Sequence, residues 1–133
     1  MSMTESAIKR KMIASIKEAG GYARRIEDQY AVGMVDTILI PRGLPVFMAE
    51  VKKIHGSAFG PTPRQLEELR RIKEADYGMG HVIPIMIGHK DDTYYFHAPA
   101  NVIKCSDCFS VTTSKWAFVA QLVQYYHSGR WKE

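Results

Sequence analysis

The sequence predicts a mixed α/β fold in which helices cover a small, mostly antiparallel sheet, in the order α-β-β-β-α-β-β-α. Two segments with helical apolar spacing open on N-cap residues, and a third lies near the C-terminus. The runs between them are rich in β-branched residues and are separated by Gly and Pro. With 133 residues, 46% of them hydrophobic and 24% charged, the chain has the size of one domain. We therefore expect residues 1–133 to form a single α/β (α+β) domain.

The first helix is expected from Thr4 to Ala19, ended by Gly20-Gly21. At 100° per residue its apolar stripe is Ile8, Met12, Ile16 and Ala19. Glu5 falls inside this stripe, where a carboxylate is unusual. Either Glu5 belongs to a functional site, or Ser2-Met3-Thr4-Glu5 is a capping box in which Glu5 only reaches back to a backbone N–H.

Three strands are expected next, over Tyr22–Glu27, Val32–Ile40 and Val46–Lys52. The segment between the last two has Gly43 at its centre, which suits a hairpin loop of about five residues. A glycine-rich loop over Gly56–Gly60 follows. Thr62-Pro63 then opens a second helix to about Asp76 with an N-cap and an N1 proline. The inward stripe of this helix is Leu69, Ile72 and Gln65.

The C-terminal half predicts two further strands, His81–Ile87 and Thr93–His97, joined by a turn over Gly88–Asp92. Pro84 favours an edge strand or a bulge over a central strand. A short apolar run, Phe109–Thr112, precedes the last helix. That helix is expected from Thr113 or Ser114 to His127, and its packing stripe is Trp116, Val119, Ala120 and Val123.

Composition excludes several classes of protein. No apolar run approaches the ~18–20 residues of a membrane span, and no apolar segment follows Lys9-Arg10-Lys11 as in a signal peptide. Cys105 and Cys108, the only cysteines, suit a reducing compartment, so we expect a cytoplasmic protein. The net charge is +4, and basic residues concentrate in residues 1–25 and 61–73. This distribution favours a polyanionic partner such as nucleic acid.

The chemistry is expected around Asp36 and the segment Glu50-Val51-Lys52. If Gly43 is the centre of the hairpin, antiparallel partners sum to 86, so Asp36 faces Glu50 and Ile38 faces Met48. Two carboxylates at about 4.5–5.5 Å between Cβ atoms repel unless a cation lies between them. A divalent ion with hard oxygen ligands, Mg²⁺ or Mn²⁺, is the natural candidate, and Lys52 a partial one.

This pattern resembles the PD-(D/E)XK nuclease superfamily, and within it the VRR-NUC (virus-type replication-repair nuclease) domain. Val35-Asp36 followed by Glu50-Val51-Lys52 matches its two strands, Glu5 its preceding helical glutamate and Gln65 its following helical glutamine. Val35 departs from the proline that often precedes the aspartate. The resemblance implies a restriction-endonuclease-like fold and Mg²⁺-dependent cleavage of DNA phosphodiester bonds, in DNA repair or recombination.

Each matched residue then takes an expected role. Asp36 and Glu50 would be metal ligands, with the Val51 backbone carbonyl added as the family implies. Glu5 would hold a second ion or a water on the ion. Lys52 would orient the attacking water and offset charge on the phosphate. Gln65 would position Lys52 or the phosphate. The DNA-binding candidates are Lys9, Arg10, Lys53, Arg64 and Arg71, and the loop Gly56–Pro63 is a candidate DNA clamp.

Stand-alone members of the resembled family act on four-way (Holliday) junctions, which they cut symmetrically as homodimers, so the resemblance implies a junction-resolving homodimer. A nickase or flap endonuclease of the same fold is the alternative enzyme, and a non-catalytic basic DNA-binding module the alternative class. A small-molecule enzyme is disfavoured, because the sequence has no glycine-rich phosphate loop.

The remaining candidate residues are most simply explained by ordinary structural roles. Zinc at Cys105 and Cys108 would need further ligands, for example His97 and His127. His55 and His89 read as solvent-exposed. The four tyrosines Tyr94, Tyr95, Tyr125 and Tyr126 read as core and rim. The last helix is apolar on more than one face, so it is buried in its own fold or shared with a second copy.

Overall fold

The predicted order of elements is confirmed, with one strand more than expected, in the computed structural model, which describes residues 3–26, 35–56, 62–99, 109–111 and 118–132. The elements are α1 (Glu5–Glu18), β1 (Tyr22–Arg25), β2 (Thr37–Ile40), β3 (Val46–Lys53), α2 (Pro63–Ala75), β4 (Val82–Lys90), β5 (Thr93–His97), β6 (Phe109–Val111), α3 (Phe118–Ser128) and the 3₁₀ helix η3 (Arg130–Lys132).

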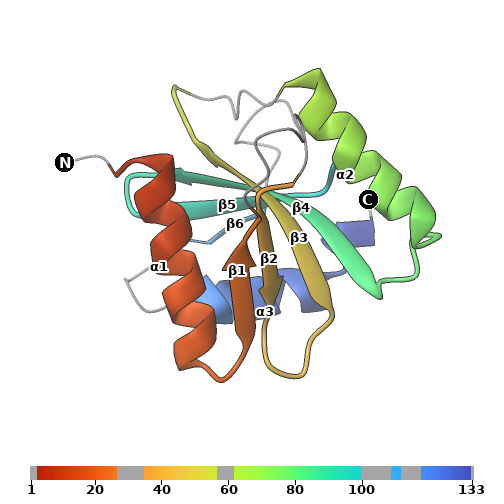
Figure 1. Ribbon diagram of the computed structural model, residues 1–133, viewed down its shortest axis with the longest axis horizontal. Helices are drawn as coiled ribbons and strands as arrows, with labels where there is room; N and C mark the ends of the chain where they lie inside the picture. The colour runs from red at the N-terminus through yellow and green to blue at the C-terminus, as the bar shows by residue number, and fades with distance from the viewer. Residues whose placement is uncertain (1–2, 27–34, 57–61, 100–108, 112–117, 133) are drawn as a thin grey trace.

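The strands form one sheet in the order β1-β2-β3-β4-β5-β6 (Figure 1). Only the central pair, β3 and β4, is parallel, and α2 connects these two strands. The other four pairs are antiparallel. The additional strand is β6, which pairs with β5 and comes from the run that the sequence marked only as apolar. The sheet is therefore mostly antiparallel, as predicted.

Helices cover both faces of the sheet. On one face α1 and α3 bury the main core together with alternate residues of the strands, including Leu39, Phe47 and Phe96. On the other face α2 buries a smaller core of Val35, Ile54, Leu69 and Met86. Because side chains alternate along a strand, Phe47, Ala49 and Val51 of β3 belong to the main core. Met48 and Glu50 consequently point to the face that α2 covers.

The start of α1 fixes one wall of the site. Thr4 is its N-cap, and the Thr4 side chain accepts a hydrogen bond from the Ala7 N–H at 3.1 Å. The predicted stripe is buried at Ile8, Met12 and Ile16, whereas Ala19 is the exposed C-cap. Gly20 has a φ of +84°, and Gly21 has no room for a Cβ beside the Ile40 carbonyl. The glycine pair therefore lets the chain turn closely from α1 into β1.

The predicted hairpin register is confirmed for the strands that carry the carboxylates. Thr37 pairs with Ala49, Ile38 with Met48, and Leu39 with Phe47. Asp36 lies just before the first pair, and its N–H donates to the Ala49 carbonyl at 3.1 Å. The observed β2 begins at Thr37, so Val35 and Asp36 of the predicted strand lie outside it. Residues 32–34 of the predicted strand lie outside the described residues.

The second helix begins as predicted. Thr62 is the N-cap, Pro63 is the first helical residue, and Asp76 is the C-cap. Leu69 is buried and Ile72 half-buried, in agreement with the predicted stripe. The glycine-rich loop before it, residues 57–61, lies outside the described residues.

Two predictions about β4 are wrong. The strand runs on to Lys90, so the turn is confined to Asp91 and Asp92. Pro84 lies in a central strand, paired with Met48 of β3. The β4–β5 pairing begins only at Met86, so the missing N–H of Pro84 removes no hydrogen bond to β5. On that side, β4 is locally an edge.

The predicted packing stripe of the last helix is also wrong. In α3 the buried residues are Phe118, Gln121, Leu122 and Tyr125, while Val119 and Val123 are half-buried and Ala120 is exposed. Trp116 lies outside the described residues. The aromatic face packs inward because β5 presents rings to it: Phe118 lies 4.9 Å from Tyr94 and Tyr125 lies 5.5 Å from Phe96, between ring centroids.

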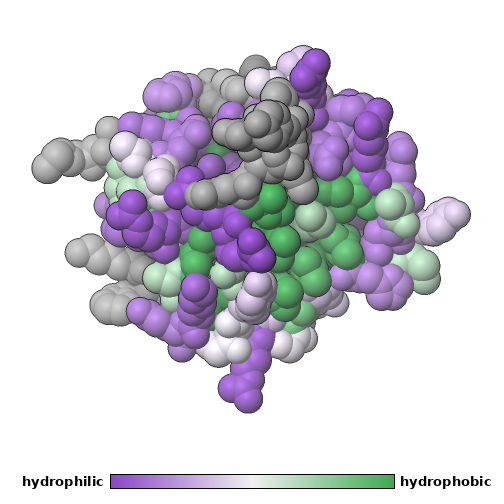
Figure 2. Space-filling model, viewed as in Figure 1, coloured by the Kyte–Doolittle hydropathy of each residue, from purple (hydrophilic) through white to green (hydrophobic). Residues whose placement is uncertain are grey.

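Apolar surface remains on the sheet. Ile38, Ile40, Val46 and Met48 are half-buried, on the face opposite the main core, and Met48 also packs against the smaller core. Figure 2 shows a hydrophobic area in the middle of the molecule, where Figure 1 draws β2 and β3. Within the described ranges, no helix has the length and apolar character needed to cross a bilayer.

Candidate active site

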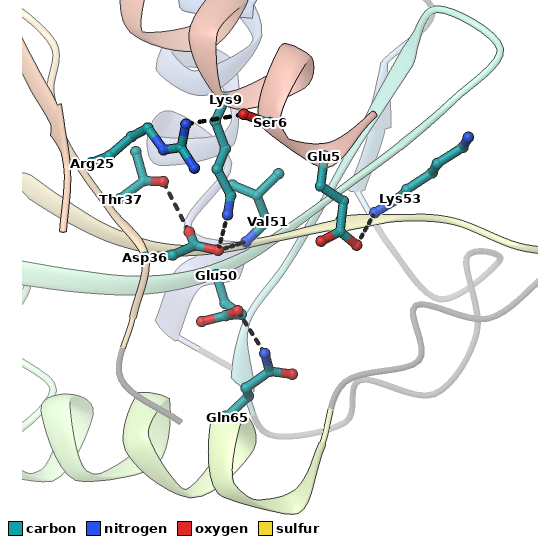
Figure 3. A network of polar contacts seen from close by, with 10 residues as sticks. All are labelled: Glu5, Ser6, Lys9, Arg25, Asp36, Thr37, Glu50, Val51, Lys53 and Gln65. Carbon is teal, nitrogen blue, oxygen red and sulfur yellow. Dashed lines mark hydrogen bonds and ion pairs between the residues drawn. The ribbon is translucent and has the colours of Figure 1, made fainter. Parts of the chain in front are cut away.

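The polar cluster lies where four elements meet: the first turns of α1, the start of β2, the second half of β3 and the first turn of α2 (Figure 3). The antiparallel hairpin of β2 and β3 supplies Asp36 and Glu50. The two helices approach them from opposite faces of the sheet. Residues that are distant in sequence therefore converge at one end of the sheet.

Asp36 is surrounded by donors. Its Oδ1 accepts a hydrogen bond from the Thr37 hydroxyl at 2.9 Å. Its Oδ2 forms an ion pair with Lys9 Nζ at 2.9 Å and accepts a longer bond from the Val51 N–H at 3.4 Å. Both side chains of the ion pair are largely buried, with 13% of Lys9 and 19% of Asp36 exposed. An ion pair this shielded is held more firmly than a surface pair.

Glu50 is more buried than Asp36 and less well satisfied. Its Oε1 accepts a hydrogen bond from Gln65 Nε2 at 2.7 Å. Its Oε2 is buried and has no hydrogen-bond partner among the described residues. Burial first, and then the adjacent Asp36 carboxylate, raise the pKa of Glu50 to about 8, against the opposing effect of Lys52 and Lys9.

The predicted carboxylate pair is therefore present, and the fold makes it electrostatically costly. A buried carboxylate oxygen without a donor, next to a second carboxylate, fits a divalent cation with hard oxygen ligands. Lys52 shares the strand face of Glu50, two residues away, and its charge acts on Glu50. The Val51 carbonyl also fits, because the N–H and C=O of one strand residue point to the same side, here toward Asp36.

Gln65 is held at both ends of its amide. Its Oε1 accepts a hydrogen bond from the Thr62 N–H at 2.8 Å. The backbone N–H of Gln65 donates to the Thr62 hydroxyl at 3.2 Å, so a complete capping box forms. This fixes the amide so that Nε2 points at Glu50. The contact is with Glu50; no bond from Gln65 to Lys52 occurs in the part of the chain that the structure describes.

The capping-box explanation of Glu5 is wrong. Glu5 is the first residue of α1, and its Oε1 accepts a hydrogen bond from the Lys53 N–H at 3.1 Å, 48 residues away. The cap itself is made by Thr4. Glu5 therefore ties α1 to the end of β3, beside the carboxylate pair (Figure 3). Across the ranges described, no three His, Cys, Asp or Glu side chains form a metal-ligating group, and the expected role of Glu5 toward a metal stays a prediction.

The predicted basic residues divide into two groups. Lys9 is drawn into the carboxylate cluster. Arg10, Arg64 and Arg71 are exposed, and Arg71 pairs with Glu67 one helical turn earlier. Lys53 is half-buried and lines a cavity of about 500 Å³ next to the cluster. The other lining residues of this cavity are Met3, Ile54, His89, Lys90, Asp91 and Asp92.

Sequence reasoning missed two contributors. Lys9 was expected to contact DNA, yet it pairs with Asp36. Its position four residues after Glu5, on the same helix face, is the signal that could have placed it in the site. Thr37 was expected only as part of a strand, yet its hydroxyl holds Asp36. No sequence signal marks Thr37, because a threonine is an ordinary residue of a strand.

The weaker candidates are resolved in part. His89 is buried in β4, so the prediction that it is solvent-exposed is wrong; burial lowers its pKa. His97 is buried and His127 exposed, while Cys105 and Cys108 lie outside the described residues. Tyr94 and Tyr125 are core residues and Tyr95 and Tyr126 rim residues, as predicted.

Comparison with known proteins places the fold. A scan against protein-family models and a search of curated proteins found no match. Among solved structures, Hjc from Archaeoglobus fulgidus, described as a Holliday junction resolvase from an archaeal hyperthermophile, matches with a TM-score of 0.56. The match covers 84% of this chain and 90% of that chain at 14% sequence identity. The chain thus shares its fold with this structure, in agreement with the restriction-endonuclease-like fold that the sequence predicts.

Proposed function

We propose that this protein is a divalent-metal-dependent endonuclease that hydrolyses phosphodiester bonds in branched DNA, with four-way junctions as its main substrate. Within its superfamily we assign it to the VRR-NUC type, on the five sequence positions Glu5, Asp36, Glu50, Lys52 and Gln65. The observation that carries the proposal is the buried pair of Asp36 and Glu50 with Lys52 two residues on. The fold it shares with a junction resolvase supports the same activity.

Asp36 and Glu50 would hold a Mg²⁺ or Mn²⁺ ion, together with the Val51 carbonyl. When bound, such an ion polarises the phosphate, lowers the pKa of water and stabilises the leaving oxygen. The buried Glu50 Oε2 supports this assignment, because it lacks a protein donor among the described residues. Glu5 would contribute from α1, at the side of the cluster where its carboxylate meets the Lys53 N–H.

The chain's own groups would do the rest. Lys52 would offset charge that develops on the phosphate and orient the attacking water. Gln65 would act as a positioning residue: its amide fixes the rotamer of Glu50 through the 2.7 Å bond. Thr37 would fix Asp36 in the same way, through the 2.9 Å bond from its hydroxyl.

DNA would bind through the basic residues that flank the cluster. Arg10 is an exposed residue of α1, and Arg64 and Arg71 are exposed residues of α2. Lys53 borders the cavity beside the cluster. These four positions lie on both sides of the carboxylates, so a backbone that contacts them would cross the cluster. Phosphate contacts of this kind carry affinity without sequence preference.

We also propose that the protein acts as a homodimer. A junction presents two equivalent scissile strands, and the described part of each chain holds one carboxylate cluster, so two symmetry-related copies would give paired cuts. The aliphatic residues of β2 and β3 that remain partly accessible, Ile38, Ile40, Val46 and Met48, support a second copy on that face. The aromatic residues of β5 and α3 do not, because Phe96, Phe118 and Tyr125 are buried within the chain's own core.

The test is a cleavage assay over end-labelled four-way junctions, flaps, nicked duplexes and plain duplexes, with Mg²⁺ and with excess chelator. We expect paired symmetric cuts in the junction that disappear with chelator and in Asp36→Asn and Glu50→Gln, while these variants still bind DNA. Single cuts in a nicked or flapped duplex would favour the alternative nuclease. If the protein binds these DNAs but cleaves none of them, the non-catalytic DNA-binding module is the remaining explanation.

A further inference from the structure

Lys9 occupies a place that a surface lysine rarely takes. Its side chain is 13% exposed, and its ammonium lies 2.9 Å from Asp36 Oδ2, inside the carboxylate cluster (Figure 3). It stands four residues after Glu5, so α1 directs both side chains toward the same end of the sheet. Burial of a lysine stem and head is tolerated only when the charge is paired.

The remaining contacts of Asp36 show what the ammonium contributes. The Thr37 hydroxyl holds Oδ1, and the Val51 N–H reaches Oδ2 only at 3.4 Å. Among the described residues, Lys9 is thus the one full positive charge that contacts this carboxylate. A divalent ion that bound Asp36 through Oδ2 would need the position of the ammonium, because two cations on one carboxylate oxygen repel each other.

We propose that Lys9 is a displaceable internal cation: it neutralises Asp36 until a divalent ion binds, and then turns from the carboxylate toward the DNA backbone. This inference rests on the proposed metal site. It makes Lys9 a positioning residue with two alternative partners. Arg10, the next residue of α1, is exposed, so a DNA backbone bound at this helix would lie near Lys9.

The exchange has a thermodynamic signature that a simple structural ion pair lacks. Loss of a structural pair would weaken both the fold and the metal site. Loss of a competing cation weakens the ion-depleted fold, because Asp36 is left beside Glu50 without its ammonium, but strengthens metal binding. Opposite changes in these two quantities are the result expected if Lys9 and the metal compete for Asp36.

The experiment compares wild type with Lys9→Met and a matched control, Lys11→Met, which removes an exposed lysine of the same helix. Binding of Mn²⁺ is measured from the free-ion signal in electron paramagnetic resonance, and melting is measured after chelation. For Lys9→Met we expect about tenfold tighter Mn²⁺ binding, the equivalent of one charge-assisted hydrogen bond. Its chelated form should melt about 3–5 °C lower. Lys11→Met should match wild type in both.

A second measurement keeps the test decisive if Lys9→Met does not fold. In wild type labelled with ¹⁵N at lysine Nζ, the Lys9 signal should shift when Mg²⁺ is added. An unchanged signal at saturating Mg²⁺ would overturn the exchange.

Equal or weaker Mn²⁺ binding by a folded Lys9→Met variant would also overturn it, and junction cleavage by wild type would then leave the proposed function standing. Absence of Mn²⁺ binding in wild type itself would overturn both the exchange and the metal-dependent nuclease.

Discussion

At the residue scale, the chemistry centres on a charge that the fold makes expensive. Glu50 is 4% exposed, lies against a second carboxylate and has one oxygen without a donor among the described residues. Buried carboxyl groups with strongly shifted pKa values cluster at functional sites. The neighbouring Asp36 differs, because it is bonded to Lys9, Thr37 and Val51.

This predicts a pH-dependent stability that Glu50→Gln removes. The pKa of Glu50 in the fold, about 8, lies above its ordinary value of 4.5, so folding favours the protonated form. The stability this provides is complete below pH 4.5 and is lost as the pH rises through about 8. In the presence of chelator, Glu50→Gln should match wild type near pH 4.5 and exceed it at pH 8.5 by on the order of 1 kcal/mol or more. Denaturant melts at both pH values measure this; a constant difference would contradict it.

Glu5 permits a separation of its two roles. Glu5→Ala removes the acceptor of the Lys53 N–H and should cost about 1–2 kcal/mol of stability. Glu5→Gln keeps an acceptor oxygen and should melt close to wild type. If the carboxylate also serves the metal, Glu5→Gln should still lower junction cleavage by about tenfold or more. Normal cleavage by Glu5→Gln would leave Glu5 as a brace between α1 and β3.

At the element scale, α2 couples a helix start to the site. The capping box of Thr62 and Gln65 begins the helix, and the same Gln65 amide reaches Glu50. A capping glutamine is an ordinary way to start a helix, so the sequence pattern gives little hint of the second contact. The contact exists because α2 crosses the sheet face on which Glu50 points.

Two variants separate these functions of α2. Thr62→Ala removes the hydroxyl cap and leaves the bond from Gln65 to Glu50. Gln65→Leu keeps the hydroxyl cap, which the backbone N–H of residue 65 makes, and removes both the bond to Glu50 and the acceptor of the Thr62 N–H. Each should lose about 1 kcal/mol of stability. Only Gln65→Leu should lower cleavage, by about 10–100-fold. Equal cleavage rates in the two variants, measured at saturating Mg²⁺, would show that the Glu50 contact does not serve catalysis.

At the scale of the whole molecule, a net charge of +4 and exposed basic residues on α1 and α2 predict salt-sensitive binding of DNA. Four phosphate contacts, one for each of Arg10, Lys53, Arg64 and Arg71, give a slope of log K against log salt of about −3.6. Fluorescence anisotropy with a Glu50→Gln protein and a labelled junction measures it. Arg64→Ala should reduce the slope by about one; a slope near zero would exclude a phosphate-dominated interface.

The proposed dimer predicts a surface-specific effect. Ile38→Glu places a charge among the partly accessible aliphatic residues of β2 and β3. This variant should be a monomer where wild type is a dimer, as measured by analytical ultracentrifugation. Tyr77→Glu is the matched control, because Tyr77 is 89% exposed elsewhere, after the end of α2. Wild type that sediments as a 15.1 kDa monomer, with and without junction DNA, would rule out paired cutting by two copies.

Most of the element order, the hairpin register around Gly43 and the carboxylate pair could be predicted from the sequence, and β6 could not. The predicted features depend on local rules: helical and strand periodicity, caps at Thr4 and Thr62, and the side-chain alternation that puts Glu50 and Lys52 on one face. Each rule involves residues a few positions apart, or one turn of known geometry. A pattern in a single chain is enough to apply them.

Only the tertiary structure decided which partners these residues meet. The Glu5 bond to Lys53, the Lys9 bond to Asp36 and the inward face of α3 each depend on how separate elements pack. For α3, the sequence offered two apolar faces, and the rings of β5 selected the aromatic one. A central strand tolerates Pro84 because the pairing with β5 begins only at Met86, so no partner is left without the missing N–H. Such contacts are set by long-range packing free energy, which local periodicity does not contain.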